Sequence, residues 1–90
     1  MQYLVIERYR EGAAPVYERV AREGRMLPDG LLYLDSWIDA EHLDRCFQLM
    51  ETDDAALFDE WTARWSDLVE FEIVPVITSA EAARRSRPSD

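Results

Sequence analysis

The sequence has no lysine and few basic residues of any kind. Its ten basic residues stand against nineteen acidic ones, and the formal net charge at pH 7 is −9. A surface of this sign repels phosphate groups, so the composition argues against nucleic acids and anionic membranes. We therefore expect neither a nucleic-acid partner nor a membrane partner.

Cysteine and histidine occur once each. A lone Cys46 excludes an intramolecular disulfide and a zinc site built on several thiolates. No apolar run approaches the roughly 20 residues that a membrane span requires. The N-terminus also lacks the charged and apolar stretches of a signal peptide. These absences predict a cytoplasmic protein without a metal ion or a cofactor.

What the sequence does have is a regular order of strand-like and helix-like segments. Strand patterns lie at 2–9, 31–38, 45–51 and 69–77, and helix patterns at 15–25 and 53–68. This β-α-β-β-α-β order is that of the ferredoxin-like fold. We expect an α+β domain with a four-stranded antiparallel sheet in the order 4-1-3-2 and two helices on one face. Residues 1–80 would form this single domain and 81–90 a C-terminal tail, with a short helix over Ser79–Arg85.

Local signals indicate where these elements begin and end. Pro15 suits the first turn of a helix, and Gly24 suits the end of the same helix. Thr52 is expected to cap the second helix. Pro75 has no backbone N–H, which predicts that the last strand lies at an edge of the sheet or leaves it early.

The second helical segment carries large apolar residues at helical spacing: Phe58, Trp61, Trp65 and Leu68. Steps of three and four residues place such side chains on one face of a helix. An alternative is that the two tryptophans line a flat pocket for an aromatic ligand. The spacing favours core residues.

Several segments resemble a family of small bacterial proteins known as domain of unknown function 3303. The resemblance is carried by Leu32–Trp37 (LYLDSW), Arg45–Asp54 (RCFQLMETDD) and Trp61–Leu68 (WTARWSDL), and it covers roughly residues 1–80. It implies a subunit of the dimeric α/β-barrel kind, in which two ferredoxin-like sheets meet face to face in a homodimer. That wider superfamily includes cofactor-free monooxygenases, haem enzymes, lactone isomerases and effector-binding modules, so the fold does not select a function.

Strand alternation is expected to give the sheet one apolar and one polar face. The apolar side chains expected beneath the helices are Leu4, Ile6, Leu32, Leu34, Phe47 and Leu49. The opposite face is then expected to hold the candidate ligand-binding residues Glu7, Tyr33, Asp35, Trp37 and Gln48. Because a buried carboxylate is costly without a partner, this set predicts a ligand pocket, a polar network at a dimer interface, or a pairing with Arg8 or Arg45.

His42 is a candidate general acid or base, because an imidazole titrates near neutral pH. It lies among Asp39, Glu41 and Asp44 in the short connection between the second and third strands. The alternative is an exposed loop histidine. One imidazole with flexible carboxylates is too little to predict a metal site.

Three functions stay open at this point. The first is binding of a neutral or cationic small molecule in a semi-polar cavity on the sheet face away from the helices. The second is an enzyme of the cofactor-free monooxygenase or isomerase type, in which a carboxylate or His42 removes a proton next to a carbonyl group. The third is a purely structural dimer without a ligand.

Overall fold

The structure, a computed structural model, describes residues 1–87, and the predicted tail residues 88–90 lie outside the described range. Its strands are β1 (Gln2–Tyr9), β2 (Leu32–Ile38), β3 (Arg45–Glu51) and β4 (Val69–Val76), and its helices α1 (Ala13–Glu23), α2 (Leu57–Ala63) and α3 (Ser79–Arg85). The strands form one antiparallel sheet in the order β2-β3-β1-β4. The predicted α+β class, element order and sheet order are confirmed.

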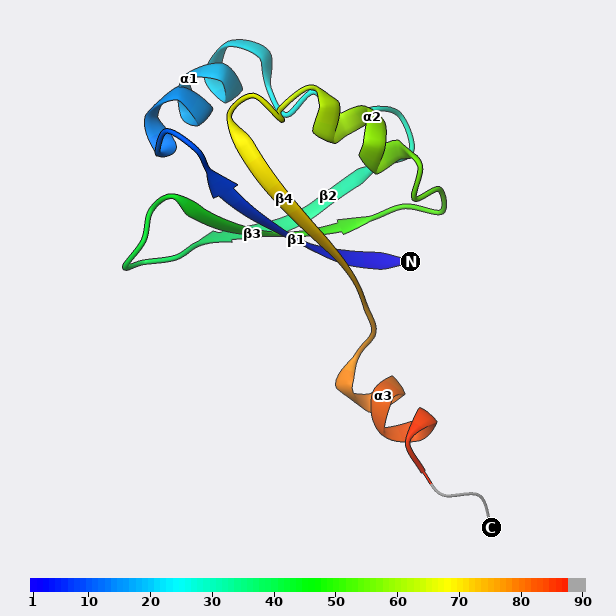
Figure 1. The fold of residues 1–90 in the computed structure, drawn as a ribbon. Helices are drawn as coiled ribbons and strands as arrows, with labels where there is room; N and C mark the ends of the chain where they lie inside the picture. The colour runs from blue at the N-terminus through cyan, green and yellow to red at the C-terminus, as the bar shows by residue number, and fades with distance from the viewer. Residues whose placement is uncertain (88–90) are drawn as a thin grey trace.

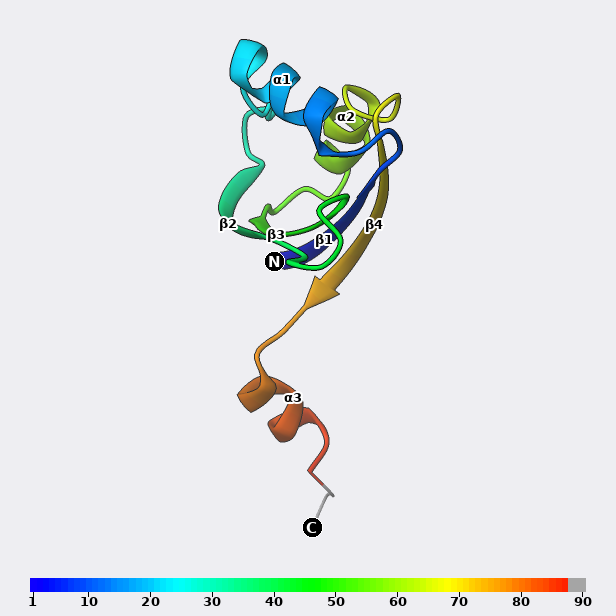
Figure 2. The ribbon, with the colours of Figure 1, turned by 90° about the vertical axis from the view of Figure 1, so that its left-hand side faces the viewer.

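The helices α1 and α2 lie on the same side of the sheet (Figures 1 and 2). β1 runs through the centre, so Glu7 is flanked by Cys46 of β3 and Phe71 of β4. Alternation places Val5, Glu7 and Tyr9 on one face of β1, and all three are buried. We call the side covered by α1 and α2 the helix face and the other side the open face.

The predicted orientation of β1 and β3 is wrong. On β3 the buried residues are Cys46, Gln48 and Met50, so this set lies beneath the helices together with Val5 and Glu7. The residues expected there are half-buried or exposed instead: Leu4, Ile6, Leu32, Leu34, Phe47 and Leu49. Alternation fixes which residues share a face. It does not fix which face receives the helices when both carry apolar side chains.

A β-bulge in β2 changes a second expectation. Tyr33 pairs with Met50, but the next paired residue of β2 is Asp35, opposite Leu49. A bulge adds one residue to one strand, so the alternation of β2 reverses across it. Tyr33 therefore lies on the helix face, whereas Asp35 and Trp37 lie on the open face. The prediction that Tyr33 and Asp35 share a face is wrong.

Helix α1 ends where its sequence predicts. Gly24 adopts a φ of 70°, and its N–H donates to the carbonyl oxygen of Val20 at 2.8 Å. Only glycine takes this left-handed conformation without strain. Pro15 lies in the first turn of the helix, and Val16 is its buried residue. This end sends the chain back over the sheet toward β2.

Helix α2 is shorter than predicted. The Asp54 N–H bonds to Thr52 Oγ1 at 3.1 Å, and Asp54 Oδ1 accepts from the Ala56 N–H at 3.0 Å. These local hydrogen bonds form a turn that competes with helix, so the helix begins at Leu57 and Thr52 does not cap it. Of the four residues expected to point inward, Phe58, Trp61 and Trp65 are buried as predicted, whereas Leu68 is only half-buried.

β4 is an edge strand, as Pro75 predicts. Beyond it, α3 projects away from the sheet (Figure 2), over the range where the sequence suggests a short helix. The Thr78 side chain caps α3 by accepting from the Glu81 N–H at 3.1 Å. None of the helices within residues 1–87 is long and apolar enough to cross a membrane.

Candidate ligand-binding site

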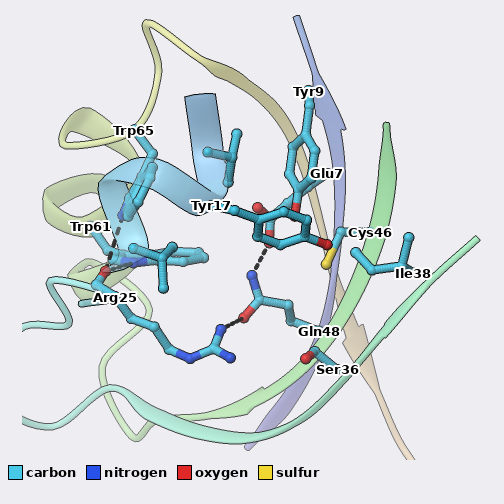
Figure 3. A pocket seen from close by; sticks show the side chains of 12 residues that line it. Glu7, Tyr9, Tyr17, Arg25, Ser36, Ile38, Cys46, Gln48, Trp61 and Trp65 are labelled. Atoms are coloured by element: carbon cyan, nitrogen blue, oxygen red, sulfur yellow. Dashed lines mark hydrogen bonds between the residues drawn. The ribbon is translucent and has the colours of Figure 1, made fainter. Parts of the chain in front are cut away.

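A cavity of about 120 Å³ lies between the sheet and the two helices (Figure 3). It is lined by Glu7, Tyr9, Val16, Tyr17, Val20, Arg25, Ser36, Ile38, Cys46, Gln48, Trp61 and Trp65. An apolar cavity of about 150 Å³ is known to hold benzene, so this one suits a molecule of about one ring. Its lining combines aromatic and aliphatic walls with a few polar groups, as ligand sites do.

Glu7 is the carboxyl group that lines this cavity. Glu7 as a whole is only 4% exposed. Burial raises its pKa from 4.5 to about 7, against the opposing effects of the Gln48 hydrogen bond and the Arg25 charge. Loss of hydration destabilises the carboxylate, while the amide N–H and the guanidinium stabilise it. Glu7 therefore exchanges a proton near neutral pH.

Gln48 and Arg25 form a chain of hydrogen bonds that ends at Glu7. The Gln48 Nε2 group donates to Glu7 Oε2, and Arg25 Nη1 donates to Gln48 Oε1 at 3.0 Å (Figure 3). The Arg25 guanidinium also lies 3.6 Å from the centre of the Tyr33 ring. Tyr33 in turn shares a 2.7 Å hydrogen bond with Ser36. The arginine is thus held by an amide on one side and an aromatic ring on another.

Two tryptophans fix the backbone that carries this arginine. The indole N–H groups of Trp61 and Trp65 both donate to the carbonyl oxygen of Arg25, each at 3.0 Å. Residues four positions apart lie on the same side of a helical turn, which lets both indoles reach one acceptor. Their polar atoms are used in this contact. The cavity therefore meets only the apolar parts of the two rings.

Cys46 and Tyr9 add neutral groups to the cavity. Burial raises the pKa of the Cys46 thiol to about 11, so it stays protonated at neutral pH. A thiol in this state is a poor nucleophile. Burial likewise raises the pKa of the Tyr9 hydroxyl. Neither group adds a charge or an acid–base step near neutral pH.

The structure separates the five residues predicted to bind a ligand. Glu7 and Gln48 line the cavity, and Tyr33 supports it through Arg25. Asp35 and Trp37 lie on the open face, on the far side of the sheet. The cavity itself lies beneath the helices, not on the opposite face as predicted. The reversed orientation of β1 and β3 and the bulge in β2 together cause this difference.

His42 does not take part in this cavity. It is exposed in the β2–β3 connection, where its backbone N–H donates to Asp39 Oδ1 at 3.1 Å. The same carboxylate accepts from the Glu41 N–H at 2.9 Å, so the Asp39 side chain shapes a turn. Within residues 1–87, no group of three potential ligands is placed to hold a metal ion.

The arginine that reaches the buried carboxyl network is Arg25, and neither Arg8 nor Arg45 as suggested. Arg8 Nε donates to Glu70 at 2.9 Å, and the Arg45 guanidinium lies 4.9 Å from the centre of the Phe47 ring. Sequence reasoning missed Arg25. Its one local signal is its place just after the end of α1. Its entry into the cavity depends on the two indoles, which no local pattern reveals.

These features define a ferredoxin-like α+β domain with a partly polar cavity beneath its helices. The model of one family, described as a domain of unknown function (DUF3303), matches residues 1–89, so the chain belongs to that family. Comparisons with curated proteins and with solved structures find no match. The function must therefore be argued from the cavity and the sheet.

Proposed function

We propose that the protein binds a small neutral molecule, about one ring in size, in the cavity beneath its helices. The observation that carries this proposal is the buried Glu7 carboxyl group. Among the hydrogen bonds within residues 1–87, Glu7 takes part only through Oε2, which leaves Oε1 for a group in the cavity. No fully buried side-chain oxygen or nitrogen within residues 1–87 lacks a hydrogen-bond partner, so Oε1, which has none, is open to the cavity, where a ligand or water can bond to it.

The charges around the cavity favour a neutral ligand. Glu7 and Arg25 have opposite signs when Glu7 is ionised, and Gln48 connects them. An anion would meet the Glu7 carboxylate, and a cation would meet the Arg25 guanidinium. A neutral molecule with an apolar body avoids both costs, because Val16, Val20 and the ring atoms of the tryptophans supply apolar contacts.

The binding unit in this proposal is a homodimer joined through the open faces of two sheets. Leu32, Leu34 and Trp37 are 54%, 41% and 51% exposed on or beside this face. A standard interface covers about 800 Å² on each partner. A second copy is the natural occupant, since two twisted sheets pack well face to face.

Acid–base catalysis is a second candidate function. Glu7 has a pKa of about 7 and an oxygen directed to the cavity, so it suits removal of a proton next to a carbonyl group. Such a step would fit an isomerase or a cofactor-free oxygenase. Binding is the simpler proposal, because the other cavity groups, Cys46 and Tyr9, stay protonated near neutral pH.

Nuclear magnetic resonance titration with cyclopentanone and pyrrole tests the binding proposal. We expect both ring compounds to shift the indole resonances of Trp61 and Trp65, with dissociation constants of about 1 mM, as befits ligands of so few atoms. The variant Val20→Phe fills the cavity and should abolish these shifts. Leu43→Phe, at a position that is 64% exposed outside the cavity, is the matched control and should keep them. Unchanged shifts in Val20→Phe, or none in the parent protein, contradict the proposal.

A further inference from the structure

The contact between Arg25 and Gln48 fixes the orientation of the Gln48 amide. A guanidinium has only hydrogen-bond donors, so the group that faces it must be an acceptor. Arg25 Nη1 accordingly donates to Gln48 Oε1 at 3.0 Å. The other end of the amide, Nε2, is then the end that reaches Glu7.

This orientation decides which oxygen of Glu7 carries a proton. Oε2 receives an N–H from Gln48, so it must act as an acceptor whether Glu7 is ionised or neutral. The carbonyl oxygen of a neutral carboxyl group is its stronger acceptor, so the Gln48 N–H favours the proton of Glu7 on Oε1, the oxygen left toward the cavity. In the ionised state Oε1 accepts hydrogen bonds, and in the neutral state it donates one.

We infer that the site takes two classes of neutral ligand, hydrogen-bond donors when Glu7 is ionised and carbonyl-type acceptors when Glu7 is protonated, with Arg25 as the positioning residue. This inference rests on the proposed binding function. Arg25 bonds to Gln48, and Gln48 bonds to Glu7, the group that would bond to the ligand. Its role is to keep the exchangeable proton of Glu7 inside the cavity.

The groups around Glu7 leave it as the one that titrates in this range. Arg25, from the loop after α1, is the charged group that acts on it. Tyr9 of β1 and Cys46 of β3 stay neutral because burial raises the pKa of each. The remaining neighbours are aromatic rings: Tyr17 of α1, Phe71 of β4 beside Glu7, and the indoles of Trp61 in α2 and Trp65 just after it.

Two probes of similar size separate the ligand classes. Pyrrole has an N–H and can only donate, whereas cyclopentanone has a carbonyl oxygen and can only accept. With a Glu7 pKa of about 7, the ionised fraction rises about tenfold between about pH 6 and pH 8. We expect the affinity for pyrrole to rise about tenfold over this interval and that for cyclopentanone to fall about tenfold, as measured by titration of the tryptophan indole resonances.

The variant Arg25→Met tests the positioning role. Without the guanidinium, the Gln48 amide can turn so that its own oxygen faces Glu7. This oxygen then accepts the Glu7 proton, which is thereby removed from the cavity. Cyclopentanone should then lose about tenfold in affinity at pH 6, while pyrrole binding well above the pKa of Glu7 should persist. The tryptophan anchor is kept, because both indoles bond to the backbone carbonyl of Arg25. Arg25→Lys, which keeps a donor-only cation, should restore cyclopentanone binding.

Arg22→Met is the matched control, because Arg22 lies on the solvent side of α1 with a side chain that is 62% exposed. It should leave both pH profiles unchanged. The inference is overturned if the two probes bind with the same pH dependence, or if Arg25→Met binds cyclopentanone at pH 6 as the parent protein does. Failure of both probes to bind at any pH instead contradicts the binding function itself.

Discussion

The buried face of the sheet carries polar side chains, and the exposed face carries large apolar ones. The helix face, which is buried, includes a carboxyl group and an amide, Glu7 and Gln48, at 4% and 5% exposure. The open face presents Leu32 and Trp37, which are more than half exposed. In a monomer that only needed stability, these polar and apolar side chains would change places. The arrangement indicates that each face serves something besides the core.

The cost of the buried carboxyl group is limited by its surroundings. Gln48 bonds to it, and the Arg25 charge favours its ionised form, yet burial still dominates its pKa. A core built for stability alone would hold an apolar residue there. The open face has no comparable explanation within one subunit, because nothing in residues 1–87 covers it. The cavity on one side and the proposed partner on the other would account for both faces.

The largest expected effect comes from the helix face. Trp61→Ala should lower the free energy of unfolding by about 3 to 5 kcal/mol, since it removes a buried indole and one of the two anchors of Arg25. Trp37→Ala, on the open face, should cost less than half as much when the separate subunit is measured at high dilution, because that side chain is half exposed there. Urea unfolding followed by circular dichroism gives both values. Equal costs would mean that the two faces do not differ as described.

The next effect concerns pH. Folding raises the Glu7 pKa from 4.5 to about 7, so the folded state holds this proton more tightly than the unfolded state. This tighter proton binding contributes fully to the free energy of unfolding below about pH 4.5. The contribution, about 3 kcal/mol, is lost as the pH rises through 7. Glu7→Gln keeps the shape and should remove this decline. Unfolding by urea between pH 4.5 and pH 8 measures the difference between the two proteins.

The acids with lowered pKa values do not obscure this comparison. Hydrogen bonds lower the pKa of Asp39, Asp67 and Glu70, so their contributions are lost only as the pH falls into the acid range. They act in the opposite direction and below the interval proposed. If the free energy of unfolding changes with pH in the same way for Glu7→Gln and the parent protein above pH 4.5, Glu7 is not buried as described.

A smaller effect is expected on association through the open face. Trp37→Asp places a charge on that face and should weaken the dimer by about 2 kcal/mol or more, the scale of an interface hot spot. Sedimentation velocity at micromolar concentration should show dimer for the parent protein and monomer for the variant. Leu43→Asp, in the β2–β3 connection, is the control and should stay dimeric. A parent protein that sediments at 10.5 kDa would contradict the dimer.

The smallest effect is expected at His42, which belongs to neither face. His42→Ala should change the free energy of unfolding by less than about 0.5 kcal/mol, as for most exposed positions. It should also leave the dimer and ring binding intact. Urea unfolding and titration with cyclopentanone check these outcomes. A clear loss of ring binding would return His42 to the candidate site.

Much of the fold follows from local patterns. Alternation locates β1 and β3, Gly24 ends α1, and Pro75 indicates an edge strand. These signals act within a few residues and do not depend on the rest of the chain. The candidate site is less accessible from sequence. Glu7 and Gln48 were expected to lie together, and the sheet order brings them together, but Arg25 enters only through the contact of its backbone with two distant indoles.

By itself, the sequence determined the elements, their order and the side chains that share a strand face, because those follow from backbone periodicity. Only the tertiary structure decided which face the helices cover and where the bulge in β2 reverses its alternation. Both faces of β1 are apolar enough to be buried, so the choice depends on the joint packing of α1, α2 and the sheet. A shift of one residue moves every later side chain of a strand to the other face. The site therefore lies beneath the helices, where Glu7, Gln48 and Arg25 meet.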